Sequence, residues 1–345
     1  MLTEQEIQQI CRRYEIPCPV CGQENGYYRL KRDMVRATES EGDGHPLNYR
    51  WGKPGFDSID PKQFFFGSCS NCGFTGELDD ADFRQSAKDI DKYKSDYIDE
   101  QLQVLVDRST AGKGIVQVLK KRVEEGGYPL SKMLAQFHLG VFIQCLRTKI
   151  LPGNIARYYL RIAWLFREQE RYYSDANIEE EGQKLERIKE RWEKDLPDQK
   201  DYPEVPQPAC NEAAAFFVSR AFFERNYETL REAKADDELR LQLLLAEIGF
   251  RLYELTDDSE DYKKAASYFS GSMQRCLSII NDKSIVGGAV NKAKELLESS
   301  GDRGRERAAR ITQELRRGQE GEDQERQEGK ERRYERHRRQ CRSRE

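Results

Sequence analysis

Two pairs of cysteines, each with two residues between them, constrain the fold of this chain more than any other feature. The pairs read Cys18-Pro-Val-Cys21-Gly22 and Cys69-Ser-Asn-Cys72-Gly73. A tight turn lets both thiolates of a pair point at one metal ion, and the glycine that follows supplies the left-handed backbone such a turn favours. Four sulfur ligands complete a tetrahedral shell with no position left for water or substrate. The sequence therefore predicts one structural Zn²⁺ held by Cys18, Cys21, Cys69 and Cys72 in a zinc ribbon.

The two pairs lie far apart for a zinc ribbon, because 47 residues separate Cys21 from Cys69, against about 15–20 in common spacings. The residues between them must form an inserted lobe. The alternatives are two unrelated pairs or a redox pair, but a redox CxxC belongs to a thioredoxin-like βαβ pattern that is absent here. His45 is an alternative ligand in place of one cysteine, although we expect this loop histidine to be exposed.

The other cysteines and His138 favour structural roles. We expect Cys11 to be buried on the helix that precedes the first pair. His138 falls in a helical pattern between Phe137 and Leu139, which favours a core or boundary histidine over a ligand or a catalytic base. The cysteines expected to be small core residues of helices are Cys145, Cys210 and Cys276.

Charge is unevenly distributed along the 345 residues, whose net charge is −4. Residues 302–345 hold more basic than acidic side chains, so the rest of the chain is acidic. An acidic body lacks the basic stripe of a dedicated DNA-binding domain. The sequence begins without a signal-peptide pattern and has no stretch near the ~18 apolar residues that a membrane span needs. We therefore expect a cytoplasmic protein with no membrane partner, whose cysteines stay reduced.

The N-terminal region is expected to be a zinc-ribbon domain over residues 1–80 with a long insert. Thr3 and Glu6 form a capping-box pattern that predicts a helix to about Tyr14. Residues 22–68 are rich in glycine and proline and are predicted to be mostly loop. Short strands are predicted at Tyr27–Leu30, Phe64–Gly67 and Phe74–Leu78.

From residue 81 to 300 the apolar pattern has a helical period. It predicts helices near 82–108, 112–125, 131–148, 153–173, 178–195, 209–234, 237–256, 259–281 and 284–299. The helix over 178–195 is expected at the surface because its apolar residues are sparse. The segment 155–167 is apolar on most sides, so we expect a central helix with Trp164 and the tyrosines in the core. Residues 301–345 are predicted to be a charged tail, partly helical and then disordered.

One pair of predicted helices resembles a tetratricopeptide hairpin. Gly249 is placed where a small residue lets the partner helix approach, while Ala265 and Phe269 fill the space between the helices. The predicted fold class is therefore mostly α: a small N-terminal zinc ribbon followed by stacked antiparallel helices that are TPR-like. We expect the ribbon and the helical body to have separate cores, so that loss of zinc unfolds only the ribbon.

The combination of these features resembles a bacterial family of unknown function, whose members join an N-terminal zinc ribbon to a TPR-like helical domain. The resemblance covers roughly residues 15–285 and rests on the two cysteine knuckles, the Arg32-Asp33 pair, Pro46–Tyr49 and the helix Ala156–Arg167. It implies the fold and the metal. It implies no activity, because the family carries no established chemistry.

No catalytic motif is present in the sequence. It contains no GxxxxGK[ST], HExxH or GxSxG pattern, and Ala111–Gly114 lacks the spacing and the hydroxyl of a phosphate loop. We therefore predict that the protein is not an enzyme. The function we favour is a zinc-binding scaffold or adaptor whose helical domain binds a partner protein, with Phe223, Tyr227 and Tyr253 as candidate anchors.

The alternative is binding of single-stranded nucleic acid through the insert. Basic and aromatic side chains alternate there, an arrangement suited to stacking bases and contacting phosphates. Acidic residues in the same insert dilute the positive field, and an acidic body repels phosphate, so we favour a protein partner. The side chains concerned are Arg29, Lys31, Arg32, Arg36, Arg50 and Lys53 with Tyr27, Tyr28, Tyr49 and Trp51.

Overall fold

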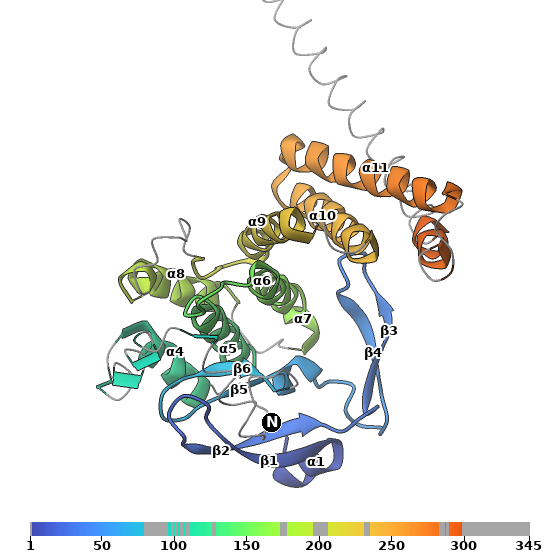
Figure 1. The fold of residues 1–345 in the computed structure, drawn as a ribbon. Coiled ribbons are helices and arrows are strands. Elements are labelled where there is room, and N and C mark those ends of the chain that lie inside the picture. Colours follow the sequence, from blue (N-terminus) through green and yellow to red (C-terminus); the bar gives the residue numbers. More distant parts are fainter. Residues whose placement is uncertain are drawn as a thin grey trace, which may run out of the picture. The chain divides into compact units, whose positions relative to one another are not determined.

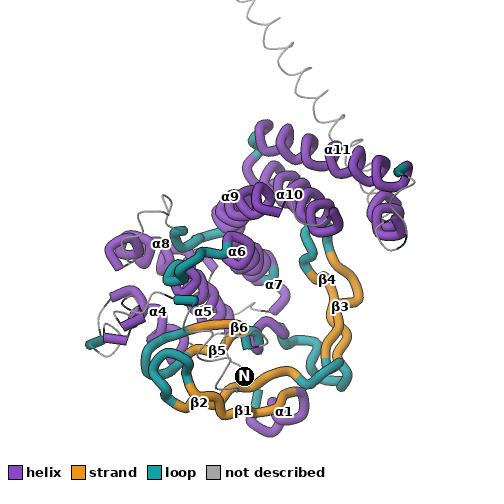
Figure 2. Tube along the Cα trace, in the orientation of Figure 1, coloured by secondary structure: helices purple, strands orange, loops and turns teal. Residues whose placement is uncertain are grey.

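The protein is mostly helical with a small N-terminal β region, as predicted (Figures 1 and 2). The computed structural model describes residues 2–78, 96–97, 100, 102–103, 106–107, 111–112, 114–125, 129–172, 178–195, 206–230, 235–282, 287 and 290–298. The chain divides into two compact units, Met1–Gly271 and Ser272–Glu345. The first unit contains both the predicted ribbon and most of the predicted helical domain. The predicted tail and most of the predicted helix over 82–108 lie outside the described residues.

The N-terminal helix is shorter than predicted. Thr3 caps α1 (Glu4–Ile10) with the expected capping box, but the chain then enters β1 (Cys11–Pro17), which pairs antiparallel with β2 (Glu24–Leu30). The predicted continuation of the helix to Tyr14 is wrong. Backbone pairing with β2 and burial of Cys11 and Ile16 outweigh a helix propensity that is only a weak local preference.

Three antiparallel hairpins replace the predicted loop-rich insert. Strand β2 contains the predicted strand Tyr27–Leu30, and β5 and β6 overlap the other two predicted strands. The hairpin of β3 and β4 was not predicted, and the reading of this stretch as loop is wrong. Besides β1 with β2, the hairpins pair β3 (Val35–Ser40) with β4 (Pro46–Trp51), and β5 (Phe66–Ser68) with β6 (Thr75–Glu77).

The helices agree with the predicted periodicity except at their ends. The predicted helix over 153–173 is divided into α6 and a short α7. Within the described ranges, no helix is both long enough and apolar enough to cross a membrane. The helices are α4 (Gly114–Glu125), α5 (Pro129–Gln144), α6 (Pro152–Arg167), α7 (Gln169–Tyr172), α8 (Ile178–Asp195), α9 (Glu212–Leu230), α10 (Ala235–Thr256) and α11 (Ser259–Asn281).

The cysteine-bearing strands and the helices share one hydrophobic core. Phe66 of β5 packs edge-on against Phe137 of α5 and Tyr158 of α6, with ring centroids 4.7 and 5.0 Å apart. Gly140 makes this approach possible, because a β-carbon there would lie 3.1 Å from the Phe66 ring. The expectation of separate cores is therefore wrong. The aromatic residues that precede the second cysteine pair therefore also pack this part of the chain against the helices.

Helix α6 is central, as predicted. Its buried side chains include Ile155, Tyr158, Tyr159 and Ile162, and it packs along α9. The close crossing predicted at Gly249 is also present, since a β-carbon there would lie 2.8 Å from that of Ala265. The TPR-like character of this hairpin stays a prediction.

Helix α8 is not a purely surface helix, contrary to expectation. Leu185, Ile188 and Trp192 are buried in the shared core, and Glu181 forms an ion pair with Arg122 of α4. Three apolar residues spaced by three and four positions lie on one helix face. Sparse apolar residues are thus enough to bury one side of this helix.

Candidate metal centre

The two cysteine turns have the same backbone geometry. The first follows β1, and the second joins β5 to β6. The amide of Gly22 donates to the Cys18 carbonyl at 2.9 Å, and the amide of Gly73 donates to the Cys69 carbonyl at 3.0 Å. Both glycines have positive φ, +73° and +75°, the conformation that glycine adopts at no steric cost. Each turn therefore aims its two thiols in one direction.

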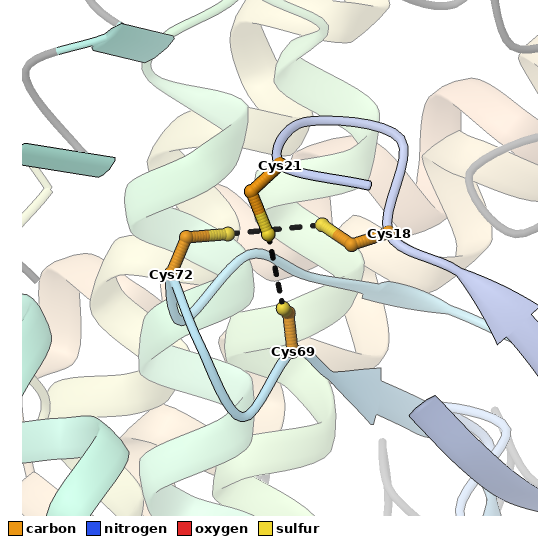
Figure 3. A group of neighbouring side chains, drawn as sticks. All are labelled: Cys18, Cys21, Cys69 and Cys72. Atoms are coloured by element: carbon orange, nitrogen blue, oxygen red, sulfur yellow. Dashed lines mark hydrogen bonds between the residues drawn. The ribbon is translucent and has the colours of Figure 1, made fainter. Parts of the chain in front are cut away.

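The four thiols converge on a single point (Figure 3). The sulfur of Cys18 lies 3.7 Å from that of Cys72, and the sulfur of Cys21 lies 3.6 Å from that of Cys69. All four sulfurs lie within 4.8 Å of one another. A tetrahedron with metal–sulfur bonds of ~2.3 Å has sulfur–sulfur edges of about 3.8 Å. The cluster therefore fits one tetrahedral metal ion, and it includes all four cysteines that the sequence predicts as ligands.

Burial makes this cluster suited to structure rather than to chemistry on a substrate. The sulfur-bearing side chains of Cys18, Cys69 and Cys72 are buried, and that of Cys21 is half-buried. A shell of four sulfurs suits Zn²⁺ or iron and leaves no open coordination position. Among the described residues, it is the sole cluster of cysteine, histidine and acidic side chains that could hold a metal ion.

Asn25 of β2 links the two turns, a role that sequence reasoning missed. Its side-chain nitrogen lies 3.6 Å from the Cys69 sulfur and donates to the Gln23 carbonyl at 2.7 Å. Its side-chain oxygen accepts from the amide and the hydroxyl of Ser70 at 3.0 and 2.9 Å. Outer groups of this kind orient metal ligands and tune them. No local pattern marks Asn25, because its partners lie 44 and 45 positions away.

The thiols influence one another's protonation. A hydrogen bond with Cys18 is the first cause that lowers the pKa of Cys69, and the same contact raises the pKa of Cys18. Cys18 therefore holds its proton more tightly than Cys69. Metal binding requires four thiolates and displaces these protons, so the affinity for metal falls as the pH falls.

His45 does not replace a cysteine, and its predicted exposure is wrong. It lies in the turn between β3 and β4, with only 4% of its surface exposed. Its Nδ1 lies 2.7 Å from a carboxylate oxygen of Glu41, and its Nε2 lies 2.9 Å from one of Glu168, an ion-pair distance without hydrogen-bond alignment. Burial lowers the pKa of His45, but contacts with Glu168 and Glu41 outweigh it, so the pKa is raised overall.

His45 belongs to a buried charge network that joins the β3–β4 hairpin to the helices, here called the hairpin network. Lys62 pairs with Glu168 and lies 3.1 Å from Asp60. Arg167 pairs with Glu41 and Asp43 of the hairpin and with Glu212 of α9. The members of the hairpin network are Glu41, Asp43, His45, Asp60, Lys62, Trp164, Arg167, Glu168 and Glu212.

The tip of the hairpin fits closely against the helical body (Figure 1). The Trp164 indole donates to Asp43 at 3.0 Å, and a β-carbon at Gly42 would meet the carboxylate end of Glu247 of α10. Hydrogen bonding with His45 is the first cause that lowers the pKa of Glu41, to about 2. The insert is therefore fastened to helices more than 100 positions away in the sequence.

The basic and aromatic residues of the insert do not form one open surface. Tyr27 and Trp51 are buried, and burial raises the pKa of Tyr49. The Lys31 ammonium donates to the carbonyls of Gln8 and Gln9, while Arg36 pairs with Asp33 at 2.8 Å. These side chains are used within the N-terminal region itself.

The candidate anchors for a partner protein are also partly internal. Phe223 is buried in the core. The Tyr227 hydroxyl bonds to Glu238 and Gln242, and Tyr253 packs against the ring of Tyr262. Phe217 of α9 is the more exposed aromatic residue, with 39% of its surface accessible.

The remaining predicted core residues are mostly where they were expected. Cys11 is buried, but on a strand rather than a helix, and Cys145 and Cys276 are buried. Cys210 is half-buried and lies near the Pro208 carbonyl. His138 is fully buried as a core histidine. Its Nδ1 lies 2.7 Å from the Leu134 carbonyl, and its Nε2 accepts from the Ala209 amide.

Residues 12–295 match a bacterial family described as "Uncharacterized protein conserved in bacteria (DUF2225)", so the chain belongs to this family. Neither the curated proteins nor the solved structures that were searched gave a match. The membership covers the four cysteines and α4 to α11. It confirms the predicted bacterial family and leaves the metal and the function to be argued from the residues.

Proposed function

We propose that this member of the DUF2225 family is a non-catalytic zinc-binding adaptor that acts in the cytoplasm and binds a partner protein through its helical domain. The observation that carries the proposal is the four-sulfur shell, which accepts a metal without leaving a coordination site for a substrate. A reducing compartment keeps such thiols available for metal. In this proposal the Zn²⁺ is structural, and it supplies cross-linking rather than chemistry.

The environment of the described histidines supports a non-catalytic role. His138 is fully buried, and burial is the first cause that lowers its pKa, to about 4. His45 lies between two carboxylates in the hairpin network. Both are held by internal partners, whereas a general base must reach the proton that it abstracts.

Protein is favoured over nucleic acid as the partner because the insert offers few free stacking faces. Tyr27 and Trp51, two of the four aromatic residues considered for base stacking, are buried. Single-strand binding relies on open aromatic faces beside free cations. In this insert, Lys31 and Arg36 bond to neighbouring groups instead.

Helix α9 offers a better anchor for a protein than the residues first considered. Phe217 is exposed, and the Arg220 guanidinium lies 5.4 Å from the centre of its ring. Arg220 is itself fixed by an ion pair of 2.5 Å with Asp261. An exposed aromatic ring beside an ordered arginine is the composition that dominates binding energy at protein interfaces.

The test is affinity capture by the full chain from cytosol of its bacterial source, with and without nuclease. The matched variants are Phe217→Ala and Leu151→Ala, since Leu151 is an equally exposed apolar residue of the same unit, at 37%. We expect a nuclease-resistant protein partner whose affinity falls about tenfold or more in Phe217→Ala and changes little in Leu151→Ala.

Two results would contradict this proposal. The first is capture of nucleic acid alone, with binding that weakens steeply as salt increases. The second is turnover of a substrate in a hydrolase, nucleotide or redox screen that persists after the metal is removed.

A further inference from the structure

A cleft of about 790 Å³ lies between the N-terminal strands and helix α5. Its volume is within the range of sites that hold small molecules. The walls combine apolar and polar side chains that come from distant parts of the sequence. They include Ile7 of α1, Ile59 and Phe64 of the insert, Phe66 of β5 and Met133 of α5. The cleft is separate from the four cysteines and from the hairpin network.

Among the described residues that line this cleft, the cation is Lys132 of α5. The residues that the structure describes give its ammonium no ion pair and no hydrogen bond. Lys132 is exposed to solvent, yet the surrounding protein desolvates it enough to lower its pKa. Burial is the cause of the shift, and within the described ranges no carboxylate offsets its cost.

The acidic residue of the cleft is engaged elsewhere. The carboxylate of Glu6 accepts from the amide and the hydroxyl of Thr3 at 2.7 and 2.8 Å. These bonds form the capping box of α1 and lower the pKa of Glu6. Glu6 therefore serves the start of its own helix rather than acting as the counterion of Lys132.

Neutral hydrogen-bonding groups lie next to the cation. Gln136 is one helical turn after Lys132, so both side chains lie on the same face of α5. The Gln136 amide lies 3.4 Å from the Ser68 hydroxyl of β5, and both residues line the cleft. The cleft thus offers one positive charge, a few polar groups and an apolar wall, which is the composition of a small-molecule site.

We propose that this cleft binds a small organic anion with an apolar body. The anionic group pairs with the Lys132 ammonium, and the apolar body packs against Phe64, Phe66 and Met133. A charge-assisted contact in a partly desolvated site is stronger than one in open water. The inference is independent of the protein partner proposed above.

The test uses 8-anilinonaphthalene-1-sulfonate as the probe, because it joins an apolar ring system to one negative charge. Its neutral counterpart, N-phenyl-1-naphthylamine, has the same rings without the sulfonate. Fluorescence titration compares the full chain with Lys132→Met, which keeps most of the length of the unbranched side chain and removes its charge. The control is Lys263→Met, which removes an exposed lysine of α11.

We expect the sulfonate to bind the parent chain and Lys263→Met equally and to bind Lys132→Met about tenfold more weakly. The neutral probe should bind all three proteins alike. Lys132→Glu should weaken the sulfonate further while cooperative unfolding is retained. Equal sulfonate affinity in Lys132→Met and the parent chain, or no binding to the parent chain, would overturn the proposal.

Discussion

The residues between the two cysteine pairs are fastened to the helical body at two places, by different kinds of bonding. At the cysteine turns the attachment is compact and apolar. Gly73 has no space for a side chain, since a β-carbon there would lie 2.7 Å from Val116 of α4, and Lys120 donates to the Asn71 carbonyl at 2.9 Å. At the tip of the β3–β4 hairpin, the attachment is the hairpin network of charged groups. One end therefore lies at a four-cysteine cluster that could hold one metal ion, and the other depends on many paired charges.

The two kinds of attachment fail differently. A metal shell loses most of its binding energy when one ligand is removed, because the remaining ligands no longer complete the coordination sphere. A buried charge network fails in part, at the group whose partner is lost. Because the two attachments differ in chemistry, each can be tested by a substitution that leaves the other intact.

The largest effect is expected from Cys72→Ser. The variant should lose its metal and should destabilise the whole first unit rather than the strands alone, because the cysteine strands share a core with α5 and α6. Zinc binding in small domains contributes about 10–16 kcal/mol to folding, so cooperative unfolding at moderate temperature should be lost. Elemental analysis and thermal unfolding measure the two outcomes.

The control for this variant is Cys210→Ser, which removes a half-buried thiol outside the cluster and should keep one zinc per chain. Iron in place of zinc in anaerobically prepared protein would correct the identity of the metal. A Cys72→Ser protein whose helices unfold at the parent temperature would restore the idea of separate cores.

An intermediate effect is expected from Glu168→Gln in the hairpin network. The substitution removes the carboxylate shared by Lys62 and His45 and leaves the buried Lys62 ammonium with Asp60 as its remaining carboxylate partner. Breaking a buried ion pair in this way costs about 3–5 kcal/mol. Urea denaturation should show this loss while the metal content stays unchanged.

Glu260→Gln provides the matched control for Glu168→Gln. Glu260 pairs with Lys263 at 2.6 Å, but both side chains are exposed, and exposed pairs contribute about 0–1 kcal/mol. Equal destabilisation by the two substitutions would mean that the hairpin network is not a buried attachment.

The smallest effect is expected from pH, and it should differ between the two histidines. The pKa of His45 is raised, so its contribution to stability is complete below the unfolded value of about 6.5 and is lost as the pH rises through the raised value. The pKa of His138 is lowered to about 4, so its contribution is present above about 6.5 and is lost as the pH falls toward 4.

Denaturation of the parent chain and of His45→Gln between pH 5 and pH 9 tests this difference. The stability difference between the two proteins should be greatest at the acidic end and should decrease as the pH rises. A difference that does not change with pH would show that His45 is neutral between Glu41 and Glu168.

The cysteine cluster could be predicted from sequence because its chemistry is local within each pair. Two residues between thiols, followed by glycine, already specify a turn that aims both sulfurs at one ion. The capping box at Thr3 was predictable for the same reason, since its partner Glu6 is three positions away. In both cases the interacting atoms belong to residues that are close in the sequence.

The hairpin network could not be predicted in this way. His45 and Glu168 are 123 positions apart, and no local pattern relates them. The hairpin itself did carry a signal, because Asp43-Gly44 is a dipeptide typical of tight β-turns. Apolar and polar residues alternate before and after this dipeptide, but the surrounding glycines and prolines favoured a loop. Cys11 illustrates the opposite error, since helix propensity extended α1 into a segment that pairs with β2.

The separation of the two cysteine pairs has a consequence for the way the protein is made. Ribosomes add about 5–20 residues per second, and Cys69 follows Cys21 by 48 positions. The first pair therefore leaves the ribosome about 2–10 seconds before the second. During that interval the nascent chain offers two of the four candidate ligands, half of a tetrahedral shell, and the hairpin tip has none of its helical partners. A metal ion can be held by all four cysteines only after Cys72 has emerged, so completion of the proposed zinc site follows synthesis of the insert.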